Sequence, residues 1–363
     1  MLGLSHGPWW WELNSGEQHT AQILKRNGYD TYLVGLSHLG KKYNELGYDA
    51  HLSPRTQALE SVDEAKRLFT EQADSEKPFF AKVGFFEVHR PFTNGSDSSK
   101  GIFVPPYLAD TKVMRNDLAT FQATIKFFDE CVGNIMKGVQ DAGIAENTIF
   151  IITSEHGIPY PGSKWAIRKA GIEIPLIIYQ PGTIFSGGKE EEALISNVDI
   201  LPTLLDYLGV SIPSQIEGKS FIPYLSGKSR QPPRNEIFGQ YTRDMKRDNE
   251  SRCVFDGRYW YIHYFSEGRS VDYPVDVDPV RFAAHLERCK TKGLRPFFQL
   301  YDVQNDPYQL NDIGGDPDNK KIVDDLSDRL LNWMKGVNDQ LIDGPVSTAY
   351  YNKSIDELKN ESK

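Results

Sequence analysis

The chain has 363 residues, of which 39% are hydrophobic and 25% are charged, as in an ordinary globular protein. This length is sufficient for one large domain and a smaller one with a sizeable buried core. The net charge of -9 argues against a nucleic-acid-binding protein, which requires a basic stripe on its surface. It does not exclude an anionic substrate, because a local cationic pocket can attract one.

Cysteine usage and hydropathy exclude further classes of protein. The three cysteines, Cys131, Cys253 and Cys289, lie far apart and form no C-x-x-C pair. This excludes a disulfide scaffold and a cysteine-based zinc site, and leaves a single disulfide open. No run approaches the about 18 apolar residues of a membrane span. The start of the chain, MLGLSHGPWWWELNSGEQ, lacks the basic region and apolar core of a signal peptide.

The first two thirds of the chain alternate between helix and strand patterns. Residues 16–27 predict a short helix, residues 29–35 a strand rich in β-branched and aromatic residues, and residues 78–86 a second, buried strand. A long amphipathic helix follows, ending near Gly143 as its C-terminal cap. Its core-facing stripe recurs at steps of three and four: Met114, Leu118, Phe121, Ile125, Phe128, Val132, Ile135 and Val139.

Two more strands are expected at residues 148–153 and 174–179, and a helix from Asp199, as its N-cap, through Leu208. Continuous apolar strands separated by helices predict an α/β fold with a mostly parallel sheet flanked by helices.

The pattern changes after the polar, proline-containing linker 227–234. Beyond it, strands at 253–255, 259–265 and 298–303 have fewer helices between them, and a helix follows at 322–334. We therefore expect a large domain over residues 1–228, a small α+β domain with an antiparallel sheet over 229–345, and a polar tail over 346–363.

Histidines follow three of the predicted strands. His38 lies in Gly35-Leu36-Ser37-His38, His89 in Phe86-Glu87-Val88-His89-Arg90, and His156 in Ser154-Glu155-His156-Gly157. Ligands of open parallel sheets bind beyond the carboxyl ends of the strands. One such histidine is more often a hydrogen-bonded structural residue, whereas three of the eight in the chain favour a shared site.

The side chains at these strand ends indicate a metal and an anion. Glu155 is a hard oxygen ligand that suits Ca²⁺, Mg²⁺ or Mn²⁺, while an imidazole such as His156 is more natural for Mn²⁺ or Zn²⁺. His156 could instead be a hydrogen-bonding residue behind the ligands. Lys164 and His89 could hold an oxyanion and stabilise charge that develops on it. Further positive charge comes from residues that could equally be solvated on the surface: Arg90, Arg168 and Lys169.

These segments resemble the sulfatases of the alkaline phosphatase superfamily, and most of all the heparan N-sulfatase branch. KPFFAKVGFFEVHRPF is similar to the family's strand followed by a sulfate-contacting histidine, and TIFIITSEHGIPYPGSKW to its metal-binding strand end and basic residue. GIEIPLIIYQPG, LISNVDILPTLLDYLGV, GKSFIPYLSG and FQLYDVQNDPYQLNDI follow in the family's order, and NSGEQHTAQILKRNGYDTYLVG resembles its opening helix and strand. The resemblance covers most of the chain.

The resemblance implies a role for each candidate residue. Glu155 and His156 would bind one divalent metal, with calcium expected and manganese or zinc left open by His156. Lys164, His89 and Arg90 would contact the sulfate, and His38 and His89 would be catalytic, with His38 as a ligand to the leaving group or its proton donor. The implied partner is a sulfated carbohydrate, and the family is expected in the periplasm, the lysosome or outside the cell.

The chain also departs from the family pattern. Glu155-His156 stands where Asp-Asn or Asp-His is usual, and Leu36 stands where many members have a sulfate-binding lysine in Gly-Lys-x-His. Neither the paired metal-binding aspartates nor a C/S-x-P/A-x-R segment, whose Cys or Ser becomes the formylglycine nucleophile, occurs in the sequence. Because the tryptophan-rich start is typical of a domain interior, we expect an N-terminally truncated sulfatase, although a short aromatic tail packed on the surface would also explain it.

Three functions follow as hypotheses. The first is a sulfatase, in its full-length form, that hydrolyses a sulfuric ester or sulfamate of a sulfated sugar, with N-sulfoglucosamine of heparan-like glycans as the expected substrate. The second is a catalytically inactive homologue or a glycan-binding protein, which the missing nucleophile favours. The third is a phosphodiesterase or phosphonate hydrolase of the same superfamily, which the Glu155-His156 pair favours slightly.

Overall fold

The computed structural model describes residues 13, 16–39, 42–54, 57–241, 250–265, 277–278, 282–284, 287 and 295–344. The tryptophan-rich start, Cys289 and the predicted tail 346–363 lie outside these residues. In chain order, the main helices and strands are α1 (Thr20–Arg26), β1 (Asp30–Gly35), β2 (Ala50–Leu52), α2 (Ala58–Gln72), β3 (Phe79–Gly84), α3 (Lys112–Asp141), β4 (Phe150–Thr153), α4 (Lys169–Ile172), β5 (Leu176–Tyr179), α5 (Ile200–Tyr207), α6 (Ile222–Leu225), β6 (Ile237–Tyr241), β7 (Ser251–Phe255), β8 (Tyr259–Tyr264), β9 (Phe298–Asp302) and α8 (Lys320–Gly336).

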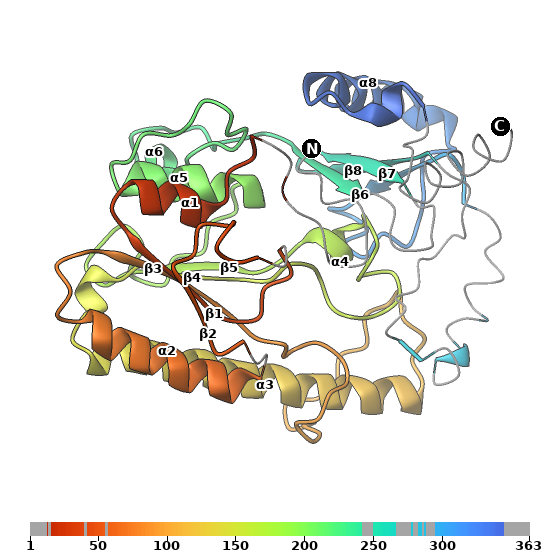
Figure 1. Cartoon of the computed structure of the whole chain (residues 1–363). Helices are drawn as coiled ribbons and strands as arrows, with labels where there is room; N and C mark the ends of the chain where they lie inside the picture. Colours follow the sequence, from red (N-terminus) through yellow and green to blue (C-terminus); the bar gives the residue numbers. More distant parts are fainter. Residues whose placement is uncertain are drawn as a thin grey trace, which may run out of the picture.

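A parallel sheet of strand order β2-β1-β3 forms the centre of the larger part of the molecule. β1 and β3 pair from Asp30 opposite Phe79 to Gly35 opposite Gly84, so their carboxyl ends coincide. Helices α2 and α3 cover one face of this sheet, and α1 and α5 lie on the other side (Figure 1). The first face is packed with apolar side chains from β1, α2 and α3, including Val34, Val62, Phe69, Ile135 and Val139. This confirms the predicted α/β fold.

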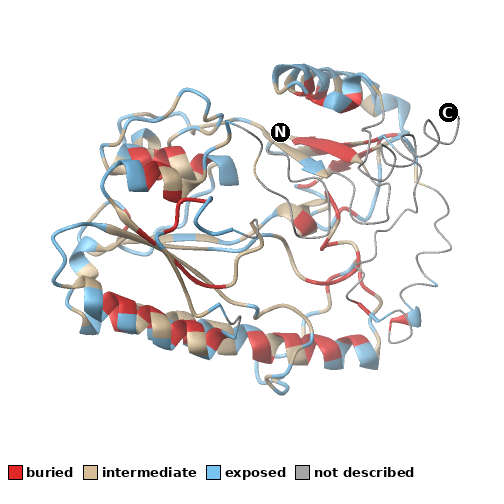
Figure 2. Cartoon of the chain, in the orientation of Figure 1, coloured by how far each residue is buried: buried red, intermediate tan, exposed pale blue. Residues whose placement is uncertain are grey.

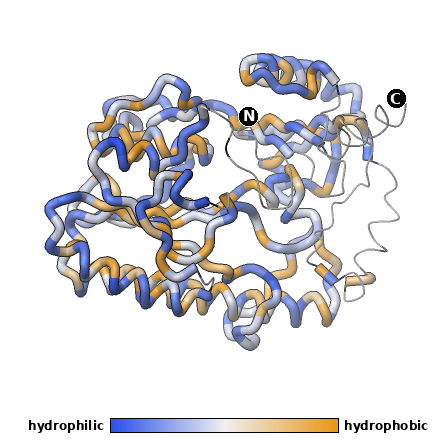
Figure 3. The backbone as a smooth tube through the Cα atoms, viewed as in Figure 1, coloured by the Kyte–Doolittle hydropathy of each residue, from blue (hydrophilic) through white to orange (hydrophobic). Residues whose placement is uncertain are grey.

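The long helix α3 follows its predicted stripe with one exception. Thr111 begins the helix by accepting the Met114 N–H at 3.1 Å, and Gly143 lies just beyond its end with a φ of +73°. Hydrophobic residues recur along α2 and α3 in Figure 3. Ile125, however, is 43% exposed, so its predicted place in the core is wrong. Asp117 and Thr124 are buried on this helix instead, because side-chain pairing and packing decide burial as well as apolar spacing.

The last two strands predicted for the large domain pair with each other. β4 and β5 are antiparallel, with Phe150 opposite Tyr179 and Thr153 opposite Leu176. Asp199 precedes α5 as predicted, but its carboxylate makes no capping hydrogen bond to that helix. It accepts hydrogen bonds from the Ser196 and Lys219 N–H groups and pairs with Arg234. An N-terminal capping role for this side chain is therefore wrong, because a buried arginine partner holds it elsewhere.

The C-terminal part is an antiparallel sheet of order β6-β7-β8-β9 covered by α8, as predicted. Figure 2 shows a buried strand, β7, and a buried stripe along α8 (Figure 2). One face of the sheet packs on α8 through Val254, Tyr261, Leu300, Leu330 and Met334. The opposite face packs on the segment around α4, where Ile167 and Ile172 contact the cluster of Cys253, Trp260 and Ile262. The C-terminal sheet therefore supports the loop that follows β4.

His19 caps helix α1 and makes the stability of this end of the sheet dependent on pH. Its Nδ1 accepts the Ala21 N–H at 3.2 Å, so the cap requires the neutral imidazole. Burial, followed by the positive charge of Lys82, lowers the pKa of His19 to about 4, while the Leu46 carbonyl opposes this shift.

Because the folded state resists protonation, the stabilisation by neutral His19 is complete above pH 6.5 and is lost as the pH falls from 6.5 toward 4. We expect the free energy of unfolding to decrease by up to about 3 kcal/mol over this range relative to His19→Asn, which keeps a capping side chain without a titrating group. Urea unfolding of both chains from pH 4 to 8 measures the difference. Parallel pH profiles would contradict this assignment.

Candidate functional site

The candidate site lies where β1, β3 and β4 end. Two glycines bring β1 and β3 into close contact: the Leu36 N–H donates to the Gly84 carbonyl at 2.9 Å, and a Cβ on Gly84 would lie 2.1 Å from the Leu36 carbonyl oxygen. Gly35 adopts a φ of +73°, which favours glycine. The backbone after β1 therefore lies against the end of β3 and places Ser37 and His38 beside the residues that follow β4.

Glu155 lies between two histidines. Its Oε2 is 3.8 Å from His38 Nδ1 and its Oε1 is 3.7 Å from His156 Nε2. The interaction with His38 contributes most to lowering the pKa of Glu155 to about 2, against a smaller desolvation effect, and the charges on His156 and Lys164 act in the same direction. The side chain is 66% exposed, so solvent screens these interactions. The carboxylate is ionised and accessible at neutral pH.

The ring of His156 is oriented by its own loop. Its Nδ1 is 2.7 Å from the Gly157 carbonyl oxygen, which can only accept, so Nδ1 carries the proton and Nε2 presents a lone pair toward Glu155. Burial is the main reason that the pKa of His156 is lowered. Gly157 fits closely against α4, since a Cβ there would lie 1.8 Å from the Ala170 carbonyl oxygen. This close packing positions the Glu155-His156 turn.

Lys164 and His89 form the second half of the site. The Lys164 Nζ is 3.1 Å from His89 Nε2, and His89 Nδ1 is 2.6 Å from the Arg90 carbonyl oxygen. By the same argument, Nδ1 of His89 carries the proton and Nε2 accepts from the ammonium. Lys164 is only 5% exposed, yet its charge affects the pKa of both Glu155 and His156. The structure thus brings together His38, His89, Glu155, His156 and Lys164.

Arg90 lies behind this group. Its guanidinium binds the two carboxylate oxygens of Asp117 on α3 at 3.2 and 2.6 Å, and both side chains are nearly buried. Its Cζ also lies 4.4 Å above the ring of Phe92 and 4.8 Å above that of Tyr160. These contacts place Arg90 in a packed aromatic environment, and its role as a sulfate contact stays a prediction.

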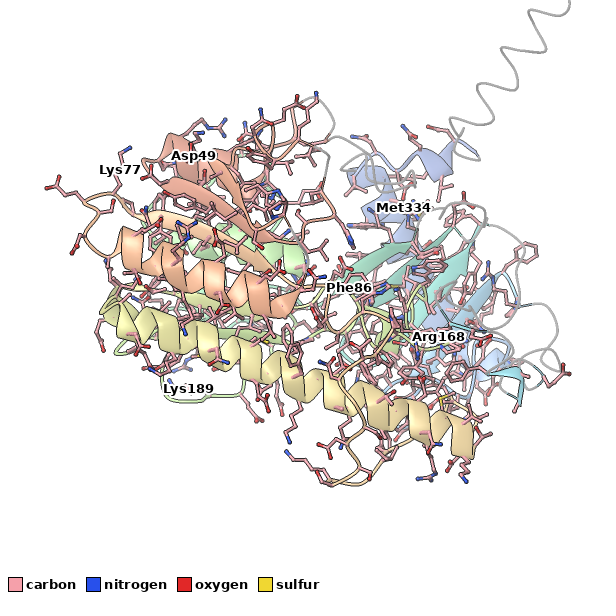
Figure 4. All side chains as sticks on the ribbon, turned by 60° about the horizontal axis from the view of Figure 1, so that its bottom comes forward. Asp49, Lys77, Phe86, Arg168, Lys189 and Met334 are labelled. Carbon is pink, nitrogen blue, oxygen red and sulfur yellow. The ribbon has the colours of Figure 1, made fainter. Side chains whose placement is uncertain are left out.

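The other basic residues named from the sequence lie toward the C-terminal sheet. Arg168 donates to the Gln309 carbonyl oxygen at 2.9 Å and to the Gln299 side chain at 3.3 Å, and Lys169 forms an ion pair with Glu173 at 3.5 Å. Arg168 and Phe86, which follows β3, are both labelled in Figure 4, in the middle of the molecule. Arg168 thus connects the loop after β4 to the C-terminal sheet.

Sequence reasoning missed Lys82 and Asp117. Lys82 lies within the apolar strand pattern of β3, and its Nζ is 3.3 Å from Ser37 Oγ at the site. Asp117 lies on α3 and holds Arg90. The alternation of side chains along β3 could have indicated that Lys82 shares a face with Phe80. No signal local to α3 indicated the partner of Asp117.

The metal-binding capacity of the site is partial. Within the part of the chain that the structure describes, no group of three or more His, Cys, Asp or Glu side chains could hold a metal ion. Glu155 and the Nε2 lone pair of His156 are suitable donors for a divalent cation, so these two residues fit as part of a ligand set. Nor do the described residues contain a helix that is long and apolar enough to cross a membrane.

Fold and site together define an α/β protein with an anion-binding arrangement at the ends of its strands. The structure aligns, with a TM-score of 0.67 and 17% identity, to a protein solved in complex with its substrate D-glucosamine-2-N,6-O-disulfate, over 90% of this chain and 84% of that one. This likeness shows the fold.

The chain belongs to the sulfatase family. The Sulfatase family profile matches residues 3–210, and a profile described as N-sulphoglucosamine sulphohydrolase, C-terminal, matches residues 163–295. An ulvan-active sulfatase of Formosa agariphila is 27% identical over 88% of the chain, and human N-sulphoglucosamine sulphohydrolase is 24% identical over 89%. The chain spans 64% and 74% of the length of these two relatives. The resemblance to sulfatases predicted from the sequence is confirmed.

Proposed function

We propose that this chain carries the sulfate-binding residues of a sulfatase that acts on a sulfated sugar, with N-sulfoglucosamine of heparan-like glycans as the substrate. The observation that carries the proposal is the buried Lys164–His89 pair beside Glu155, at coinciding strand ends of a chain in the sulfatase family. The choice of an aminosugar is supported by the human relative's name and by the substrate of the structural neighbour.

Each residue has a role that its geometry permits. Lys164 offers three N–H donors, one of them to His89, and would bind a sulfate oxygen and stabilise charge that develops there. His89 would add a second donor at Nε2 when protonated. His38, beside the ionised Glu155, would hold the proton that the departing amine or alcohol needs.

Glu155 and His156 would hold a divalent cation, for which calcium is our first choice and manganese or zinc the alternatives. A cation bound there would supply Lewis acidity toward the sulfate oxygens. The family's formylglycine would supply the nucleophile, but no C/S-x-P/A-x-R segment that could carry it occurs in the 363 residues. For this chain by itself we therefore expect binding without turnover.

The test is calorimetric titration of the purified chain with N-sulfoglucosamine and with N-acetylglucosamine, a neutral sugar of similar shape. We expect at least about tenfold tighter binding of the sulfated sugar, because hydrogen bonds to a charged group are worth roughly 1.5–3 kcal/mol. Equal affinities would overturn the proposal.

Sulfate release, followed over hours with and without calcium, separates the alternatives. No release together with binding is the expected result, and it also fits a glycan-binding protein. Metal-dependent release would contradict the expectation for this chain and establish an enzyme. Tighter binding of a phosphonate monoester than of the sulfated sugar would favour the third hypothesis, a phosphonate hydrolase.

A further inference from the structure

Lys82 is a basic residue in a strand that is otherwise apolar and small. β3 reads Phe-Phe-Ala-Lys-Val-Gly, and Lys82 lies opposite Leu33 of β1 in the parallel register. Side chains alternate between the two faces of a strand, so Lys82 shares its face with Phe80. Phe80 and Leu33 pack with Tyr48 in one apolar cluster. The aliphatic part of Lys82 thus extends along an apolar face, while its ammonium lies at the strand end.

The ammonium group of Lys82 lies at the candidate site. Its Nζ donates to Ser37 Oγ at 3.3 Å, and Ser37 directly precedes His38, whose ring faces Glu155. Among the residues that the structure describes, no carboxylate lies within ion-pair distance of this ammonium, although Glu155 is near enough for its charge to act on it. A half-buried cation with one neutral hydroxyl partner has lost hydration without an anion to replace it. An anionic ligand would supply that partner.

We propose that Lys82 is a further sulfate contact of this site, binding a sulfate oxygen on the His38 side, opposite Lys164. The inference rests on the proposed function and names a residue that the sequence analysis did not assign. It also accounts for Leu36. This chain lacks the basic residue expected two positions before His38, and Lys82 delivers a positive charge to Ser37, one position before His38, from the neighbouring strand.

The charges around the site support this arrangement. Burial lowers the pKa of Lys82 and the carboxylate of Glu155 opposes that change, so the two groups act on each other across the site. Lys164 acts on Glu155 from the other half. A doubly charged oxyanion placed between Lys82 and Lys164 would therefore meet a positive group on each side, with Glu155 left for the cation.

The experiment compares Lys82→Met, which keeps the apolar part of the side chain, with Lys82→Arg, which keeps the charge. Lys77→Met is the matched control, since Lys77 is an exposed lysine just before β3, at the end of the strand away from Phe86 (Figure 4). Calorimetric titration with N-sulfoglucosamine and with inorganic sulfate gives the dissociation constants. We expect about a tenfold loss of affinity for Lys82→Met, at most about threefold for Lys82→Arg, and no change for Lys77→Met.

Thermal unfolding of each variant separates binding from folding. Because methionine removes an incompletely paired charge, Lys82→Met should melt at or above the temperature of the parent chain. Unchanged affinity of Lys82→Met, with the parent binding the sulfated sugar, would overturn the role of Lys82 and leave the proposed function standing. Equal losses for Lys82→Met and Lys82→Arg would show a purely structural role. A parent chain that does not distinguish N-sulfoglucosamine from N-acetylglucosamine would overturn both proposals.

Discussion

Lys164→Met is expected to weaken binding of N-sulfoglucosamine by roughly 10- to 100-fold, because a hydrogen bond to a charged group is worth about 1.5–3 kcal/mol. Lys164 is 5% exposed and is held 3.1 Å from His89 Nε2, so solvent cannot easily replace its ammonium group. Its charge also acts on Glu155 and His156. Titration calorimetry of the variant measures the loss.

Lys169→Met is the matched control for this prediction. Lys169 lies five residues further along the same segment, and its ammonium pairs with Glu173 at 3.5 Å. It removes the same charge from the chain, so it tests whether net charge alone explains the effect. We expect the affinity of Lys169→Met to stay within about twofold of the parent, since exposed ion pairs contribute little. Equal losses in the two variants would show that Lys164 has no specific contact with the sulfate.

Arg90→Met is expected to lower the free energy of unfolding by about 3–5 kcal/mol, because it leaves the buried carboxylate of Asp117 without its partner. The Arg90 and Asp117 side chains are 9% and 1% exposed, and two hydrogen bonds join them. The variant also removes the guanidinium from above Phe92 and Tyr160. Urea unfolding followed by tryptophan fluorescence measures the change.

Two further variants distinguish pairing from other effects. Arg90→Met combined with Asp117→Leu removes both charges and should recover most of the lost stability, since replacing a buried ion pair by apolar residues is often neutral. Arg115→Met breaks an ion pair on the same helix whose side chains are 50% and 53% exposed, and should change stability by less than about 1 kcal/mol. If the double variant also binds N-sulfoglucosamine as the parent does, Arg90 is not a sulfate contact; a loss of binding in the folded double variant would show that it is.

Several features of the fold follow from local sequence patterns. The apolar runs at residues 29–35 and 78–86 became β1 and β3, and the stripe from Met114 to Val139 became α3. β2, α2 and β6 were not predicted, because a three-residue strand and a helix with many charged residues carry weak periodicity. The convergence of His38, His89 and Glu155 was predictable, since parallel strands end at one edge of their sheet.

The sequence by itself determined which segments form strands and helices, which family the chain resembles, and which polar residues follow the strands. These depend on the composition and periodicity of neighbouring residues. Only the tertiary structure decided the partners of the charged groups. Arg90 meets Asp117 from a position 27 residues away, Arg168 meets Gln309 from 141 residues away, and Lys82 reaches Ser37 from another strand. Burial makes such pairings strong, and burial depends on packing between distant segments, which no local pattern records.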